Sequence, residues 1–290
     1  MRYQGPIYRP PSEADSLLIQ ATVGCPHNRC TFCMVYKNTK FKVRPTQEIL
    51  EDLAEARRRF GNRIPTLFFP AGNTIAMPAA ALAEICRFSR ELFPHLTRLT
   101  VYGSSQYICR KGLKNMRLLA AAGLTRIHVG VESGDDEILR RVQKGATAEE
   151  HIRAGGILKE AGIDMSAYLV LGLGGRERTG SHARESARVI NEIQPEFLRL
   201  RTFVPKINTP LLEEVLAGRF VMLSPHEVLR ETRALLEAIE ARTCVVSDHY
   251  TNYVNVAGRL PEDKEAMLRT IDQALERDEA GFRPFFIGTQ

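Results

Sequence analysis

The chain has 290 residues, of which 44% are apolar, so it is long enough for one large globular domain with a sizeable core. Its 40 Lys and Arg against 34 Asp and Glu leave a net charge of +6 that is spread along the chain, which favours anionic small molecules or solvated faces over nucleic acid and leaves RNA open. No apolar run approaches the roughly 20 residues that span a bilayer, and the N-terminus lacks the apolar centre of a secretory signal, so we expect no membrane partner and a cytoplasmic protein.

The first predicted strand covers Ser16–Gly24 and leads into the stretch Gly24–Cys33, which contains three of the six cysteines. A helix is predicted at Pro45–Phe60, where apolar residues recur at helical spacing after an initial proline. The cysteine loop therefore lies between the first strand and the first helix.

Five further short apolar runs follow, and all but the last lead into a helical stretch. Repeated strand–helix units imply parallel strands joined by helical crossovers, so we expect an α/β fold, a partial (β/α)6 TIM-like barrel. A doubly wound open sheet is the alternative, although its Gly-rich phosphate fingerprint is missing from the first strand–helix turn. The strands are Ile64–Pro70, Leu96–Gly103, Thr125–Ser133, Ile163–Gly175 and Glu196–Pro205; the helices are Met77–Leu92, Leu113–Gly123, two short stretches up to Ala161, and Ser181–Ile193.

The tail is predicted to form a C-terminal helical and extended cap. Helical patterns at Pro225–Ala241 and Pro261–Glu276 flank the stretch Cys244–Gly258, and no Gly, Ser or Pro-rich linker precedes them. We therefore expect residues 1–210 to form the partial barrel and residues 211–290 to form a cap or lid packed on the same domain. The polar and aromatic side chains of this stretch either bind substrate or form a polar lid that satisfies its own backbone; they are Asp248, His249, Tyr250, Asn252 and Tyr253.

The cysteine loop carries Cys25, Cys30 and Cys33 at C-x4-C-x2-C spacing, at the carboxyl end of a strand where functional groups gather in such folds. Structural zinc normally takes four protein ligands, and no second Cys or His pair of matching spacing occurs. A redox pair formed by the last two cysteines leaves the first without a role. A 4Fe-4S cluster with three thiolate ligands keeps one iron open for a substrate or cofactor. The spacing alone indicates an open-ligand metal loop, with zinc and a redox pair as alternatives.

The loop resembles the cluster motif of the radical S-adenosylmethionine (SAM) superfamily, usually C-x3-C-x2-C with an aromatic residue before the last cysteine, here Phe32. This chain has one extra residue between the first two cysteines. Residues Ala121–Thr147 are similar to the fourth strand and following helix of the branch that includes methylthiotransferases, elongator-type enzymes and oxygen-independent coproporphyrinogen oxidase. The resemblance implies two cofactors, a 4Fe-4S cluster on Cys25, Cys30 and Cys33, and SAM.

The resemblance also implies which residues contact SAM. Phe32 is expected against the adenosyl group, Glu132 reaches the bound SAM from its strand end, and Lys144 pairs with the methionine carboxylate. The family residue at the last position is commonly Arg, whose planar fork grips a carboxylate with two bonds. The alternative readings are an exposed strand-end charge for Glu132 and a solvated helix-end lysine for Lys144.

Four further positions correspond to family SAM sites less closely. Gly72 and Asn73 lie where many members bind the methionine amino group through a "GGE"-like turn, but the acidic residue is absent here. Gly172 ends the fifth strand and either packs against the adenosyl group or forms a tight turn. Tyr168 stands on that strand where the coproporphyrinogen oxidase branch has an acidic residue, and Thr202–Leu211 resembles the segment that contacts adenine.

The function implied by the resemblance is reductive cleavage of SAM by the cluster to methionine and a 5′-deoxyadenosyl radical, which abstracts hydrogen from an unidentified small-molecule substrate. A reductant such as flavodoxin or ferredoxin would supply the electron. The competing hypothesis is a non-enzymatic zinc or iron–sulfur scaffold, or an RNA-binding module.

The remaining cysteines form no second cluster motif, which disfavours sulfur insertion, and the absence of a cobalamin domain disfavours cobalamin-dependent methylation. Cys109, after the third strand, is a candidate catalytic radical relay or thiol donor, or else a plain buried thiol. Cys86 and Cys244 are expected in the core.

Overall fold

The structure is a computed structural model that describes residues 1–289. Its main sheet has eight strands in the order β1-β4-β5-β6-β7-β8-β9-β10, so numbering advances along the sheet as crossover connections require. The described pairs of this sheet are parallel except for β9 with β10. The sheet begins at β1 and ends at β10 and is not closed within the described residues. This arrangement confirms the predicted α/β class and its parallel strands.

The chain divides into two compact units. Unit 1 contains Met1–Asn28, Asn38–Val129 and Gly156–Met165; unit 2 contains Arg29–Lys37, Gly130–Gly155 and the chain from Ser166 onward. The predicted boundary at residues 210 and 211 stays a prediction. In residues 1–289 we find no helix with both the length and the apolar character needed to cross a membrane.

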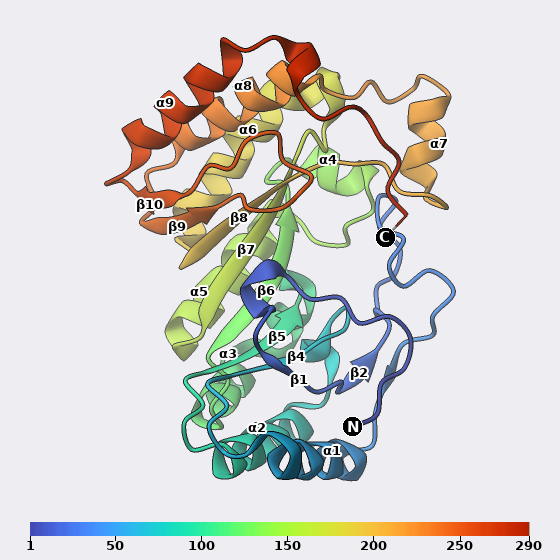
Figure 1. Cartoon of the computed structure of the whole chain (residues 1–290), viewed down its shortest axis with the longest axis vertical. Helices are drawn as coiled ribbons and strands as arrows, with labels where there is room; N and C mark the ends of the chain where they lie inside the picture. The colour runs from blue at the N-terminus through green and yellow to red at the C-terminus, as the bar shows by residue number, and fades with distance from the viewer. Residues whose placement is uncertain (290) are drawn as a thin grey trace. The chain divides into compact units, whose positions relative to one another are not determined.

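Unit 1 packs three helices, α1 to α3, beside the first strands of the sheet (Figure 1). Its strands contribute buried side chains to the core, among them Leu67, Phe68, Phe69 and Val101. The strands are β1 (Leu17–Leu18), β4 (Thr66–Phe69), β5 (Arg98–Gly103) and the first part of β6 (Arg126–Glu132); the helices are α1 (Thr46–Phe60), α2 (Ala79–Leu92) and α3 (Ser105–Ala121), with short 3₁₀ turns at Pro11–Glu13 and Thr74–Ala76.

The predicted first strand is divided in two. β1 pairs in parallel with β4, whereas β2 (Thr22–Val23) leaves the main sheet and pairs antiparallel with β3 (Lys42–Val43). The β2–β3 pair flanks the cysteine loop, so the chain enters and leaves the loop on two neighbouring strands.

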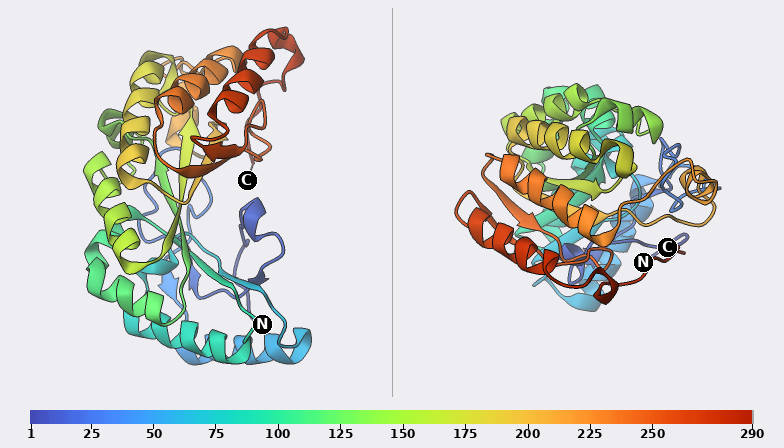
Figure 2. Two further views of the ribbon diagram at one scale, coloured as in Figure 1. Left: turned by 90° about the vertical axis from the view of Figure 1, so that its left-hand side faces the viewer. Right: turned by 90° about the horizontal axis from the view of Figure 1, so that it is seen from above.

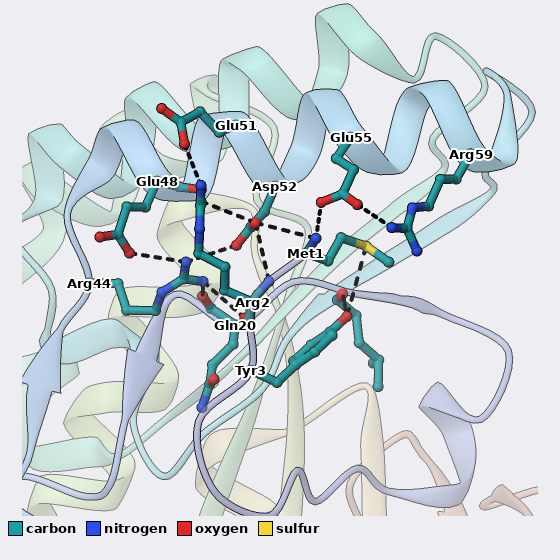
Figure 3. Close-up of polar contacts among 11 residues, drawn as sticks. Met1, Arg2, Tyr3, Gln20, Arg44, Glu48, Glu51, Asp52, Glu55 and Arg59 are labelled. Atoms are coloured by element: carbon teal, nitrogen blue, oxygen red, sulfur yellow. Dashed lines mark hydrogen bonds and ion pairs between the residues drawn. The ribbon is translucent and has the colours of Figure 1, made fainter.

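A buried ion pair fastens the exit of this loop to α1. Arg44, directly after β3, donates to Asp52 Oδ2 at 2.8 Å, and the two side chains are only 1% and 3% exposed. Arg44 also donates to the carbonyl of Gln20 at 2.6 Å. Figure 3 shows that the N-terminal residues add to this network, since Arg2 bonds to Asp52 and Met1 to Glu55. Charges buried this deeply need partners, and here each has at least two.

Unit 2 carries the second half of the sheet and a layer of three helices, α6, α8 and α9, that lie side by side (Figures 1 and 2). α8 starts with a capping box, in which Ser224 and Glu227 each bond to the other's backbone N–H. The strands are β7 (Asp164–Leu171), β8 (Phe197–Thr202), β9 (Thr243–Val246) and β10 (Gly258–Leu260); the helices are α4 (Asp136–Arg141), α5 (Ala148–Ala161), α6 (Gly175–Ile193), α7 (Pro210–Leu216), α8 (Pro225–Ala238) and α9 (Lys264–Leu275), with a 3₁₀ turn at Glu279–Gly281.

The tail contributes two strands that the six predicted strand–helix units do not include. β9 pairs in parallel with β8, with Phe197 opposite Cys244, and β10 pairs antiparallel with β9. The run that forms β9 has four residues, too short for a periodicity to be read from the sequence. Part of the predicted cap is therefore an extension of the main sheet.

Candidate active site

The second half of the cysteine loop lies in unit 2 and is fixed by main-chain hydrogen bonds. Thr31 N–H donates to the carbonyl of Val142 at 3.0 Å, and the Thr31 carbonyl accepts from Leu211 N–H at 3.0 Å. Cys33 N–H donates to the Cys30 carbonyl at 3.3 Å, which makes a tight turn of the last two cysteines. With both of its backbone groups used, Thr31 holds Cys30 and Cys33 to the segment after α4 and to the start of α7.

Phe32 packs against a buried apolar cluster in the same unit. The cluster contributes side chains from α4, from the segments after β7 and β8, and from α7 and the segment after it. This packing anchors the aromatic residue that the family motif places beside the cofactor, and its contact with SAM stays a prediction. The cluster residues are Ile138, Val142, Leu173, Phe203, Leu211 and Phe220.

Cys25 lies in unit 1, where two glycines shape the backbone before it. Gly24 has φ +77°, and a Cβ at this position would lie 3.2 Å from the Thr39 carbonyl oxygen. The Gly24 carbonyl accepts from Gly72 N–H at 3.1 Å. Gly72 therefore supports the start of the cysteine loop, while its predicted contact with SAM stays a prediction.

None of the six cysteines, all within the described residues, forms a disulfide. Thiolate sulfur is the ligand that iron–sulfur clusters take, so the donors present fit such a cluster. No group of three His, Cys, Asp or Glu in residues 1–289 is arranged to hold a metal ion. The assignment of Cys25, Cys30 and Cys33 as cluster ligands thus remains a prediction from the motif. Cys86 is fully buried, and burial raises its pKa to about 12, which keeps it a thiol.

Asn73 follows β4 in unit 1 and holds an unused acceptor. The residue is only 1% exposed, and its side-chain Nδ2 donates to Ser104 Oγ at 3.0 Å. Its Oδ1 is buried and has no hydrogen-bond partner in residues 1–289. An acceptor left in this state costs free energy unless a ligand supplies a donor, and an ammonium group is such a donor.

Glu132 and Lys144, two predicted SAM contacts, are brought together in unit 2. Lys144 Nζ donates to Glu132 Oε1 at 2.7 Å, and the side chains are 12% and 13% exposed. Gly130 makes room for the pair, because a Cβ there would lie 2.1 Å from Glu132 Oε1 and 2.8 Å from Lys144 Nζ. The two residues are therefore neither an isolated strand-end charge nor a solvated lysine.

His151, on α5, is near enough to Lys144 to respond to its charge. Burial and then the Lys144 ammonium lower the pKa of His151 to about 3. At neutral pH the imidazole is uncharged, so Lys144 carries the positive charge of this pair.

A buried pair of His182 and Glu231, which the sequence does not reveal, contacts the backbone of Glu132. His182 Nδ1 lies 2.9 Å from Glu231 Oε1, and its Nε2 lies 3.4 Å from the Glu132 carbonyl oxygen. Because both neighbours are acceptors, both ring nitrogens donate. Burial lowers the pKa of His182, but the charge and hydrogen bond of Glu231 outweigh burial and raise it. Both side chains are nearly or fully inaccessible, at 2% and 0% exposed.

Glu231 also holds the turn after β7. Its Oε1 accepts from Gly172 N–H at 2.7 Å, and its Oε2 accepts from Thr179 Oγ1 at 2.6 Å. Gly172 has φ +76°, a conformation that favours glycine, so the tight-turn reading of this residue is confirmed. Its packing against the adenosyl group stays a prediction.

The turn between β6 and α4 is fixed by Asp135. Its Oδ1 accepts from the N–H groups of Glu137 and Ile138, which caps α4, and its carboxylate also accepts from Arg178 and Ser181. Burial would raise the pKa of Asp135, but these hydrogen bonds lower it. Asp135 therefore fixes the connection between Glu132 and Lys144.

Two predicted site residues lie outside these groups. Tyr168, on β7 in unit 2, is 7% exposed, and the guanidinium carbon of Arg201 lies 4.9 Å from its ring centroid. Cys109 lies in unit 1 within α3, before a break at Gly112 (φ +71°); the helical segment after this break begins at Leu113 as predicted, and the segment from Ser105 that contains Cys109 was not predicted. Their roles toward cofactor or substrate stay predictions.

The fold is α/β with an open, mostly parallel sheet, and the Glu132–Lys144 pair lies at the carboxyl end of β6. The chain belongs to the radical SAM superfamily, whose family model matches residues 19–187. Membership supports SAM-cleaving radical chemistry in general, which uses a 4Fe-4S cluster and SAM as cofactors.

Two curated relatives match parts of the chain. The 4′-phospho-dehydrooxetanocin synthase of Priestia megaterium is 29% identical over 174 residues, which cover 54% of this chain and 23% of that protein. The tRNA-2-methylthio-N(6)-dimethylallyladenosine synthase of Dehalococcoides mccartyi is 25% identical over 208 residues, 69% of this chain and 48% of that protein. The chain thus spans less than half the length of either relative.

Solved structures support the fold. The cobalamin-dependent SAM radical enzyme OxsB, with aqua-cobalamin and SAM bound, aligns with a TM-score of 0.61 and 16% identity over 77% of this chain and 41% of that one. Coproporphyrinogen III oxidase (HemN) of Escherichia coli, a radical SAM enzyme, aligns with a TM-score of 0.55 and 18% identity over 77% and 52%. These neighbours and the methylthio synthase fit the branch that the sequence resembles.

Proposed function

We propose that this chain cleaves SAM reductively and directs the resulting radical to hydrogen abstraction from a small-molecule substrate. When bound, the cluster and SAM supply a one-electron cleavage that yields methionine and a 5′-deoxyadenosyl radical. An external reductant such as flavodoxin or ferredoxin would deliver the electron. The protein's own contribution is to hold the cofactor in one geometry and exclude water, since positioning governs such a step.

The observation that carries the proposal is the Lys144–Glu132 pair beside Gly130. Lys144 is a largely buried cation that pairs with the Glu132 carboxylate, and its neighbour His151 is neutral at physiological pH. We infer that Lys144 exchanges Glu132 for the methionine carboxylate of SAM, which leaves the Glu132 carboxylate available to accept hydrogen bonds from the cofactor.

The second support comes from Asn73. Asn73 corresponds in sequence to the turn with which many family members bind the methionine ammonium, and its Oδ1, which has no hydrogen-bond partner in residues 1–289, can accept a hydrogen bond without the negative charge of the family's acidic residue. We propose that Asn73 replaces that residue. Cys25, Cys30 and Cys33 would hold the cluster, and the backbone bonds of Thr31 and Gly72 would keep the loop in place.

Anaerobic reconstitution tests the proposal. The protein is loaded with iron and sulfide, reduced with dithionite and given SAM, and 5′-deoxyadenosine is measured by mass spectrometry. We expect a brown protein that forms 5′-deoxyadenosine, and we expect Cys25→Ala, Cys30→Ala and Cys33→Ala each to lose colour and product. Cys86→Ala is the matched control and should keep both, because its buried thiol is not a ligand. Zinc in place of iron, with no 5′-deoxyadenosine, would refute the proposal.

A further inference from the structure

The segment after β9 folds onto the carboxyl end of β8 in unit 2. Asn252 fixes it there, since its Nδ2 donates to the carbonyl of Leu200 at 2.8 Å and to that of Ser247 at 2.9 Å. Its Oδ1 accepts from Thr202 Oγ1 at 3.0 Å. The segment that bears His249 therefore has a defined place beside the last residues of β8.

Within residues 1–289, two cations at this strand end have no carboxylate partner. Arg201, on β8, contacts the ring of Tyr168, and Lys206 follows β8, where its backbone pairs with Gly288. Both side chains are partly buried, and in residues 1–289 neither forms an ion pair or donates a side-chain hydrogen bond. Partly buried cations that lack a counter-charge are costly, and a bound anion removes that cost.

His249 lies within the electrostatic reach of both cations. Burial, followed by the charges of Arg201 and Lys206, lowers the pKa of His249 to about 4, so its ring is neutral at physiological pH. Thr251 N–H donates to His249 Nδ1 at 3.3 Å, which makes Nδ1 an acceptor and places the ring proton on Nε2. The ring therefore adds an N–H donor to the two cations.

We propose that Arg201, Lys206 and His249 bind an oxyanion of the substrate, a carboxylate or phosphate group. The inference that the ligand is the substrate rests on the proposed function, because the one carboxylate of SAM is assigned to Lys144. Arg201 offers a planar fork of donors, Lys206 a point charge and His249 a single N–H, a set suited to an oxyanion and not to a neutral or cationic group.

The test uses the full-length reconstituted protein with its cluster oxidised and no SAM or reductant. Inorganic phosphate and acetate are titrated separately at constant ionic strength, and binding is followed by calorimetry and by the side-chain NMR signals of labelled histidine. We expect saturable binding of one anion, with shifts of the His249 signals and a rise in the pKa of His249 as the bound charge offsets Arg201 and Lys206. Tighter phosphate binding identifies a phosphoryl group, and tighter acetate binding a carboxylate.

Variants locate the site. Arg201→Gln and Lys206→Gln should each weaken the anion at least tenfold, whereas Arg242→Gln, which removes an exposed arginine paired with Glu262, should leave the dissociation constant unchanged. Because both Arg201→Gln and Lys206→Gln are measured, the test remains valid if one of the two misfolds. The proposal is overturned if neither anion gives a saturable shift of His249, or if all three variants bind alike. Since no turnover is involved, failure to cleave SAM would leave this result standing, and the reverse also holds.

Discussion

Lys144 Nζ lies 2.7 Å from Glu132 Oε1, and the space that both atoms occupy exists because residue 130 is a glycine. An ion pair thus joins the end of β6 to the segment after α4, and it occupies the space that a Cβ at residue 130 would fill. Asp135 fixes the turn between them, so the pair is built into the backbone as well as into the side chains.

Gly130→Ala tests this arrangement. The added Cβ would lie 2.1 Å from Glu132 Oε1, so the pair must move, and we expect SAM affinity to fall at least about tenfold with a loss of roughly 1–3 kcal/mol in unfolding free energy. Calorimetric titration with SAM and urea denaturation measure the two effects. Gly180→Ala, on an exposed turn of α6 with nothing near its Cβ, should instead gain about 0.5–1 kcal/mol and keep its affinity. Equal behaviour of the two variants would contradict the arrangement.

Two substitutions of Lys144 test whether its positive charge contributes to SAM binding. Lys144→Met removes the charge-assisted bond, and we expect the dissociation constant of SAM to rise about 10- to 100-fold. Lys144→Arg keeps the charge and offers two donors to a carboxylate, so we expect affinity within about threefold of the original. Lys159→Met, at an exposed position of α5, serves as the control. Unchanged SAM binding by Lys144→Met would remove Lys144 from the cofactor site.

Arg44→Met should destabilise the protein by about 3–5 kcal/mol, because Asp52 would remain buried after losing its closest cationic partner. Urea denaturation measures the loss. The double variant Arg44→Met with Asp52→Leu should recover much of it, since an apolar pair of similar size replaces the ions. If the double variant is as unstable as the single one, the ion pair is not the cause.

The lowered pKa of His151 predicts that the protein loses stability as the pH falls. Its pKa is about 3 in the folded protein and about 6.5 in an unfolded chain, so the unfolded state takes up a proton first and stability falls as pH drops below 6.5. At pH 5 this amounts to about 2 kcal/mol. His151→Gln should flatten the dependence between pH 6.5 and 5 by that amount in urea denaturation series. A variant with the original slope would assign the effect elsewhere.

Glu231→Gln should lower the pKa of His182 by removing the charge that raises it. A raised pKa stabilises the folded state below about 6.5, and this contribution is lost as pH rises through the folded value. The variant should therefore lose more stability at pH 6 than at pH 8. Histidine NMR titration and denaturation at both pH values measure this, and an unchanged His182 titration would contradict the pairing.

The elements were predictable because they depend on local patterns. Apolar runs and helical spacing identified the strands from β4 to β8, and the cysteine spacing with Phe32 identified the family. The division of the first strand was missed, since the run Ser16–Gly24 gives no sign that its two ends pair with different strands, β4 and β3.

The supporting contacts were not predictable because their partners are distant in sequence. His182 and Glu231 are 49 residues apart, and nothing in either helix marks the other as its partner. Arg44 and Asp52 are closer, but their burial depends on the fold of the N-terminal segment around them. Gly130 looks like an ordinary interruption of a strand pattern until the Glu132 and Lys144 side chains are seen in the space beside it.

The hydrogen bonds of Glu231 with the Gly172 N–H and with His182 limit how this protein can be truncated or joined to another. Glu231 belongs to α8, so a chain cut after the last predicted barrel strand would lose the acceptor of the Gly172 N–H and the charge that raises the pKa of His182. The C-terminal portion is therefore not an interchangeable attachment. Any minimal catalytic fragment or chimaera made from this chain has to carry α8 with it, or replace His182 at the same time.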